Sequence, residues 1–217
     1  SRGHPGRSRC RLGRFGRVDR GGGKSVIAGT GRLRPALQGM NYKSAMGDNT
    51  LRELVSGKGA HVDPIACIED ISAGLAARTV AGYPHSIWQI VDHMSYWMDY
   101  DLGKVAEEDR QYPLRAIESW PSHPNPSADA RSAEEAWQTS VRVFFELLAR
   151  LAMLAESDAG DLARKVHNIG SADSPRQSTV GAMLWQLAAH NSYHTGQIAL
   201  LRRQLGAWPP RRGGDHW

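Results

Sequence analysis

Residues 184–205 read LWQLAAHNSYHTGQIALLRRQL. Apolar side chains recur in this stretch every three or four positions, which predicts an amphipathic α-helix. His190 and His194 stand four residues apart, so both rings leave the same face of that helix. Met183, Leu187 and Ile198 share this face by the same spacing. The sequence therefore predicts a helix that directs two imidazoles toward an apolar core.

A second segment of helical period, residues 86–108, places His93 on a stripe with Ile90 and Trp97. A buried polar ring without a partner costs about 1–3 kcal/mol, so three imidazoles in one core require an explanation. A shared divalent metal would provide one, and three nitrogen ligands with an open position are typical of a reactive site. Three imidazoles suit Zn, Ni, Fe or Mn. The alternative is that His93, His190 and His194 are core residues satisfied by hydrogen bonds, with no metal.

Four other side chains are weaker candidates. Gln197 lies three residues after His194 and is positioned to hydrogen-bond a metal-bound water or a ring N–H, although a polar residue at a bundle edge has the same spacing. Asp92 and Glu146 carry carboxylates that could serve as a fourth ligand or support a ligand, but their spacing does not select them. His85 is expected to face solvent or the rim of a pocket.

The rest of the domain also has helical patterning. Ser132 with Glu135 reads as a capping box before a long helix, and Gly206 with the prolines beyond it ends the last one. Proline-rich residues 112–127 and residues 156–177 are expected to be irregular, and no segment alternates as a strand does. The sequence predicts an all-α protein, a four-helix bundle with long crossover connections. The helices are expected at residues 50–56, 64–75, 86–108, 133–155 and 178–204.

The positive charge of the chain is concentrated at its beginning. Residues 1–45 hold eleven Lys and Arg against one Asp, which gives a net charge of +10. Because the whole chain has a net charge of +5, residues 46–217 have a net charge of −5. This Arg/Gly-rich segment has few large apolar residues and is predicted to be disordered. We interpret it as a start-site artefact, with translation beginning at Met40 or Met46; the alternative is a segment that binds RNA or anionic surfaces. The folded domain is predicted at residues 46–208, and residues 209–217 as a disordered C-terminus.

Composition also excludes several classes of protein. The folded domain is mildly acidic, which argues against a nucleic-acid surface on it. Cys10 and Cys67 are the two cysteines of the chain and cannot form a disulfide framework. No apolar run has the 18 or so residues of a membrane span, and the N-terminus lacks the apolar centre of a secretory signal. These features predict a cytoplasmic protein that does not contact membranes.

Two segments together resemble a known family. Residues 86–93 read SIWQIVDH and residues 184–198 read LWQLAAHNSYHTGQI, in which His-x-x-x-His-x-x-Gln-Ile follows a Trp-Gln-Leu run. The pattern resembles the DinB-like superfamily, the bacterial damage-inducible, YfiT-related, metal-binding four-helix bundles, and the resemblance covers about residues 46–208. It implies that the family's metal triad falls on His93, His190 and His194.

The resemblance also implies an activity. Members of the family use low-molecular-weight thiols such as bacillithiol or mycothiol in transfer or isomerisation reactions, and dimers are common among them. We therefore expect a metal-dependent enzyme of the thiol-transferase type that acts on a small molecule and forms a homodimer. The same centre could instead hydrolyse its substrate. The alternative is a non-enzymatic metal-binding bundle that acts in a stress response.

Overall fold

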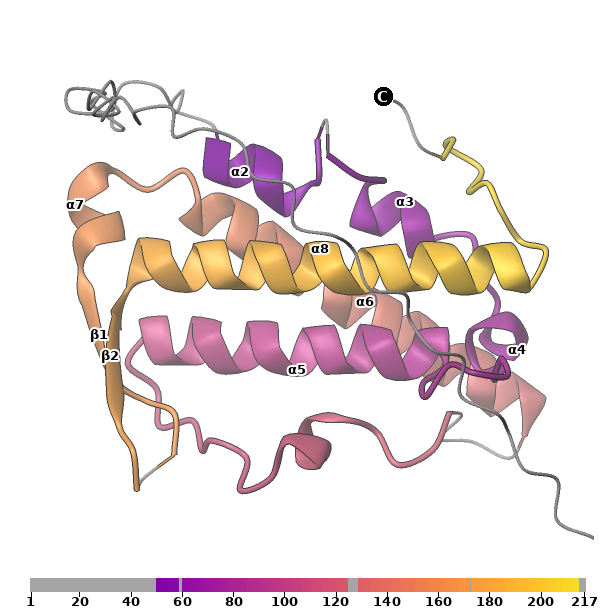
Figure 1. Ribbon diagram of the computed structural model, residues 1–217, viewed down its shortest axis with the longest axis horizontal. Helices are drawn as coiled ribbons and strands as arrows, with labels where there is room; N and C mark the ends of the chain where they lie inside the picture. Colours follow the sequence, from indigo (N-terminus) through magenta and orange to yellow (C-terminus); the bar gives the residue numbers. More distant parts are fainter. Residues whose placement is uncertain (1–49, 59, 125–128, 172, 215–217) are drawn as a thin grey trace, which may run out of the picture. The chain divides into compact units, whose positions relative to one another are not determined.

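The structure is a computed structural model that describes residues 50–58, 60–124, 129–171 and 173–214. The predicted tail, residues 1–45, lies outside the described residues. Helices dominate the fold, which confirms the predicted helical class (Figure 1). In chain order the elements are α2 (Thr50–Val55), α3 (Pro64–Ile68), α4 (Ala73–Ala76), α5 (Ile87–Val105), the 3-10 helix η1 (Ala116–Ser119), α6 (Ala130–Leu154), α7 (Ala159–Ala163), β1 (Lys165–Ile169), β2 (Arg176–Thr179) and α8 (Val180–Gln204).

Three long helices form the centre of the fold. Helix α5 packs against both α6 and α8, and α5 and α8 lie side by side in opposite directions (Figure 1). The short helices cover the rest, with α2 on α6 and α8, α3 on α8, and α4 on α6. Trp88, Phe144 and Leu201, one from each long helix, are fully buried between them. Burying a side chain of this size contributes about 1.5–3 kcal/mol, so the apolar stripes of the three helices hold them together.

Side chains fix where the long helices begin. Ser86 caps α5 in a capping box with Gln89, as the helical segment from residue 86 predicts. The predicted capping box of Ser132 is wrong, because Asp129 caps α6 by accepting hydrogen bonds from the backbone N–H and the hydroxyl of Ser132. Thr179, rather than residue 178, caps α8. Each cap satisfies a backbone N–H that the first turn of a helix leaves unpaired.

The helix predicted over residues 64–75 is broken into α3 and α4, and the reason lies in contacts with distant residues. The indole Nε1 of Trp137 donates to the backbone carbonyl of Ile71 at 2.6 Å. The buried guanidinium of Arg202 donates to the carbonyl of Cys67 and to the carboxylate of Asp70, both at 2.7 Å. These partners compensate for the helical hydrogen bonds that the break removes, and Ser72 then caps α4.

A two-stranded antiparallel hairpin is the second difference between the structure and the sequence prediction. It lies mostly within residues 156–177, a segment that was expected to be irregular. Strand β1 pairs with β2, with Lys165 opposite Thr179 and Ile169 opposite Arg176, and the register shifts between these pairs. Because of that irregularity only Val166 and Ile169 are buried, three residues apart, so no period-two pattern marks the strand. The hairpin contacts α5 and leads directly into α8 (Figure 1).

The chain after α8 returns to α3. The backbone N–H of Arg211 donates to the carboxylate of Asp70, and Arg212 forms an ion pair with Glu69. These contacts fall within residues 209–217, the segment predicted to be a disordered C-terminus, of which the structure describes residues 209–214. Among the helices that the structure describes, none combines the length and apolar character that a membrane crossing requires.

Candidate metal centre

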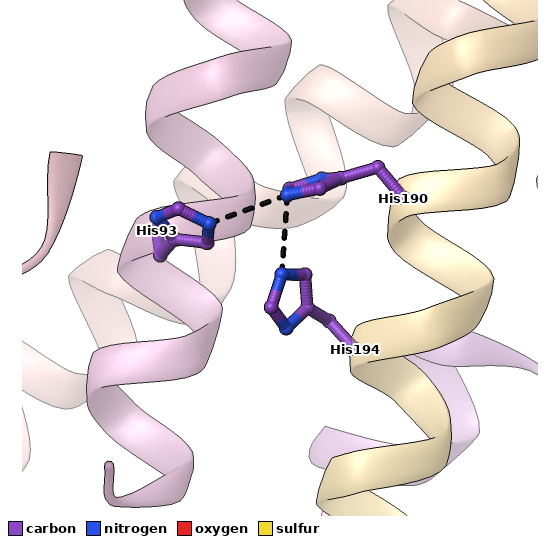
Figure 2. Close-up of side chains that lie close together, drawn as sticks. All are labelled: His93, His190 and His194. Atoms are coloured by element: carbon purple, nitrogen blue, oxygen red, sulfur yellow. Dashed lines mark hydrogen bonds between the residues drawn. The ribbon is translucent and has the colours of Figure 1, made fainter. Parts of the chain in front are cut away.

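The packing of α5 against α8 brings the three predicted histidines together. His93 lies in the first half of α5, and His190 and His194 lie one turn apart on the facing side of α8. Their Nε2 atoms converge: that of His190 is 3.2 Å from His93 Nε2 and 3.1 Å from His194 Nε2 (Figure 2). His93 and His194 are buried and His190 is half-buried. The three rings form a cluster that could hold a metal ion.

Hydrogen bonds on the far side of two rings determine which nitrogen faces the centre. His93 Nδ1 donates to the backbone carbonyl of Ser119 at 3.0 Å, and His194 Nδ1 donates to Gln197 Oε1 at 2.7 Å. A carbonyl oxygen can only accept, so both Nδ1 atoms carry the proton and both Nε2 atoms present a lone pair. Gln197 is itself held, because its Nε2 donates to the hydroxyl of Tyr193 at 3.0 Å.

The resulting geometry fits a cation better than a hydrogen-bonded cluster. Two inward lone pairs leave at most one proton, on His190 Nε2, for the two short contacts. Three nitrogens bound at 2.0–2.1 Å to a tetrahedral ion lie about 3.3 Å apart. Two of the separations here are 3.1 and 3.2 Å, and all three ligand atoms lie within 4.8 Å of one another. Hydrogen bonds from Nδ1 to oxygen are what orient imidazole ligands in metal sites. The donor set of His93, His190 and His194 therefore suits a divalent ion.

His190 differs from the other two rings at its outer nitrogen. Its Nδ1 is buried without a hydrogen bond among the described residues, and so is the side-chain oxygen of Asn191. Asn191 nevertheless interacts with this ring in the direction that raises the pKa of His190. Asn191 instead donates from Nδ2 to the sulfur of Met98 at 3.3 Å, so it is a neighbour of the His190 ring and not its hydrogen-bond partner.

Burial keeps the cluster uncharged at neutral pH. Removal from water lowers the pKa of His93 and of His190 to about 4, and neighbouring histidines act in the same direction. Burial also lowers the pKa of His194. Neutral imidazole is the form that binds metal. At pH 7 protons therefore do not compete for these three nitrogens.

An aromatic stack covers one side of the cluster. The indole of Trp120 lies between two imidazoles, 3.7 Å from the ring centroid of His93 and 3.7 Å from that of His85, and nearly parallel to both. Ser119 is the last residue of η1 and Trp120 follows it, so the crossover after α5 both orients His93 and shields it. His85 was expected to face solvent or a pocket rim, but the structure places it half-buried in this stack.

Comparison with known proteins agrees with this arrangement. A family model of the DinB superfamily matches residues 65–198. The chain belongs to the DinB superfamily. The match begins in α3, ends within α8 and contains all three histidines, so the resemblance predicted from the two segments is confirmed. Neither the curated proteins nor the solved structures compared with the chain gave a match.

The two carboxylates considered as further ligands lie elsewhere in this DinB-superfamily protein. Asp92 and Glu146 line a separate cavity between α5 and α6. Asp92 interacts there with Ser140 and Trp88, and burial raises its pKa. Within the described residues the cluster contains histidines alone. Helix geometry explains why Asp92 is not part of the cluster: it precedes His93 by one residue and so points about 100° away from it.

A cavity of about 370 Å³ opens beside the cluster, and Trp120 is not among the residues that line it. His190 borders it directly. Three aromatic side chains from α5 and the crossover contribute to its wall, together with one acidic and one basic residue. They are Trp97, Tyr100, Tyr112, Asp101 and Arg176. Trp97, which shares the α5 stripe with His93, is half-buried and borders the cavity.

Proposed function

We propose that His93, His190 and His194 bind one divalent metal ion, Zn, Ni, Fe or Mn, and that the protein is a metal-dependent enzyme acting on a small molecule. The observation that supports this most strongly is the convergence of three Nε2 atoms, two of them with lone pairs directed inward by hydrogen bonds on the opposite ring nitrogen. The membership of the DinB superfamily supports it independently.

The chain's own residues would each have a defined task. A divalent ion held by three neutral imidazoles would supply uncompensated positive charge that acidifies a water or thiol. Ser119 and Gln197 fix the orientation of two rings, and Trp120 keeps bulk water from one side of the cluster. His190 faces the cavity of about 370 Å³, which leaves this side for a substrate.

We propose thiol transfer, with a low-molecular-weight thiol as the second substrate, as the reaction, and hydrolysis as its alternative. Ligand pockets for small molecules have volumes of about 300–1,000 Å³, so the cavity suits a compact substrate. We also propose that the fold is a four-helix bundle in which α2, α3 and α4 take the position of one long helix. The packing of these short helices on α6 and α8 supports that assignment.

The reaction is tested with a panel of small electrophiles, with and without added thiol, on metal-loaded wild type, metal-stripped wild type and the variant His190→Ala. We expect conjugation or hydrolysis by the loaded wild type alone. The variant His167→Ala is the matched control, because His167 is exposed on β1. A rate in metal-loaded wild type no higher than that of the metal-stripped protein would contradict the enzymatic proposal and favour a non-enzymatic metal-binding protein.

A further inference from the structure

A buried carboxylate lies at the far end of the cavity from the histidine cluster. Asp101 follows His93 by eight residues on α5, about 12 Å along the helix axis, and Trp97 lies between them on the same stripe. Asp101 is buried, with 9% of the residue exposed. Asp101 and His190 both line the cavity, so the cavity connects the carboxylate with the cluster.

Asp101 has no polar partner within the described part of the chain. It makes no hydrogen bond there and no ion pair within 4.0 Å, although it does interact with the charge of Arg176 at longer range. Burial raises the pKa of Asp101 to about 7, and Arg176 opposes this shift without cancelling it. A buried carboxylate is costly unless something binds it, and the cavity is the side from which a ligand could do so.

Arg176 presents the complementary charge. It lies on β2, is exposed and lines the same cavity, and its guanidinium makes no hydrogen bond or ion pair with any described residue. Its guanidinium passes close to Gly170, where a side chain would contact it. Two opposite charges that face one cavity without touching each other are complementary to a molecule that carries both charges.

The wall next to Asp101 suits a cation. Trp97, Tyr100 and Tyr112 form an aromatic cluster whose ring centroids lie 5.6–5.7 Å apart. Aromatic faces attract ammonium groups, most strongly where water is excluded. The hydroxyl of Tyr100 accepts a hydrogen bond from the backbone N–H of Gly170, which joins this wall to the hairpin that carries Arg176.

We propose that this cavity binds a zwitterion of the amino-acid type, with its ammonium group at Asp101 and its carboxylate at Arg176. The remainder of the molecule would extend toward His190. Only the statement that such a ligand is a substrate rests on the proposed metal-dependent function. Recognition of the two charges depends on α5 and β2 and does not require the metal.

The test is calorimetric titration of the full chain with three matched probes. L-norvaline carries both charges, its methyl ester only the ammonium group, and N-acetyl-L-norvaline only the carboxylate. We expect norvaline to bind the metal-stripped wild type, and each singly charged probe to bind about 10–100-fold more weakly, because each lacks one charged hydrogen bond. Stripping the metal prevents the probes from binding through chelation.

Variants assign each charge. Asp101→Asn is isosteric and should weaken norvaline binding by about 10–100-fold while leaving the affinity for N-acetyl-L-norvaline unchanged. Arg176→Gln should weaken norvaline binding by the same factor while leaving the affinity for the methyl ester unchanged. Asp99→Asn is the matched control, since Asp99 lies on the same helix but pairs with Arg110 and should leave all three affinities unchanged.

Two results would overturn the proposal: equal affinity for the three probes, or norvaline binding that survives Asp101→Asn in a protein with unchanged circular dichroism. The variant His190→Ala separates the two proposals. Loss of metal with retained norvaline binding is the expected result, because recognition of the two charges does not require the metal. Retained metal with retained norvaline binding would contradict the metal site and leave recognition of the zwitterion in place. Absence of norvaline binding in a wild type that binds metal would refute the recognition alone.

Discussion

Replacing the buried carboxylate Asp101 with asparagine should stabilise the protein in a pH-dependent manner. Burial raises the pKa of Asp101 from 3.8 to about 7. A group with a raised pKa in the folded state binds more protons there than in the unfolded state. Folding is therefore penalised as the pH rises from about 4 to 7, and the penalty is complete above 7.

The size of the effect follows from the shift. Three units at 1.36 kcal/mol each give an upper limit of about 4 kcal/mol, and relaxation around the cavity reduces it, so we expect the variant to gain about 2–4 kcal/mol at pH 8. The carboxamide of asparagine has the same shape and no charge. At pH 4 the free energies of unfolding of the two proteins should be nearly equal, because Asp101 is then largely protonated in both the folded and the unfolded wild type.

The assay is urea denaturation of metal-stripped wild type and Asp101→Asn at several pH values between 4 and 8.5. Subtracting the two free energies of unfolding cancels the contributions of all other titrating groups, because both proteins share them. Asp99→Asn is the control and should lose up to about 1 kcal/mol at pH 8, because Asp99 is half-exposed and paired with Arg110. A variant at Asp101 that is less stable than the wild type at pH 8 would refute the reasoning.

Three further substitutions test individual contacts. Gln197→Leu should weaken metal binding about 10–100-fold with unchanged thermal stability of the metal-free protein, because His194 loses the oxygen that orients it; unchanged affinity in a metal titration would contradict this. Arg202→Met should cost about 3–5 kcal/mol in urea denaturation, since it leaves the carboxylate of Asp70 without its buried partner; a loss below 1 kcal/mol would show that the ion pair contributes little. Trp137→Phe should cost about 1–3 kcal/mol by leaving a buried carbonyl unpaired, and equal melting temperatures would refute that.

The helices and the histidine cluster were predictable because both depend on local periodicity. A spacing of four places His190 and His194 on one face whatever surrounds the helix. The apolar stripe of α5 in turn directs His93 toward the core. The crossover was not predictable in this way: residues 112–124 have no period, so nothing in the sequence indicated that Ser119 would orient His93 or that Trp120 would cover it.

The other differences arise from contacts between distant residues. The break between α3 and α4 depends on Trp137 and Arg202, which lie 60 or more residues away and bind backbone groups that a continuous helix would use itself. The hairpin was missed because its buried residues do not alternate. Asp101 was not selected from the sequence, since a carboxylate on a helix is ordinarily exposed and only the fold shows that it is buried. The homodimer, the thiol and the cytoplasmic location stay predictions.

The central claim is that His93, His190 and His194 hold one metal ion, and metal content per chain tests it most directly. The protein is purified without a histidine tag or chelator and analysed by mass spectrometry beside His190→Ala and the control His167→Ala. The account predicts about one ion per chain in the wild type and in the control, and little in His190→Ala. No metal in the wild type, even after incubation with Zn, Ni, Mn and Fe(II), would contradict it and leave three core histidines without a metal.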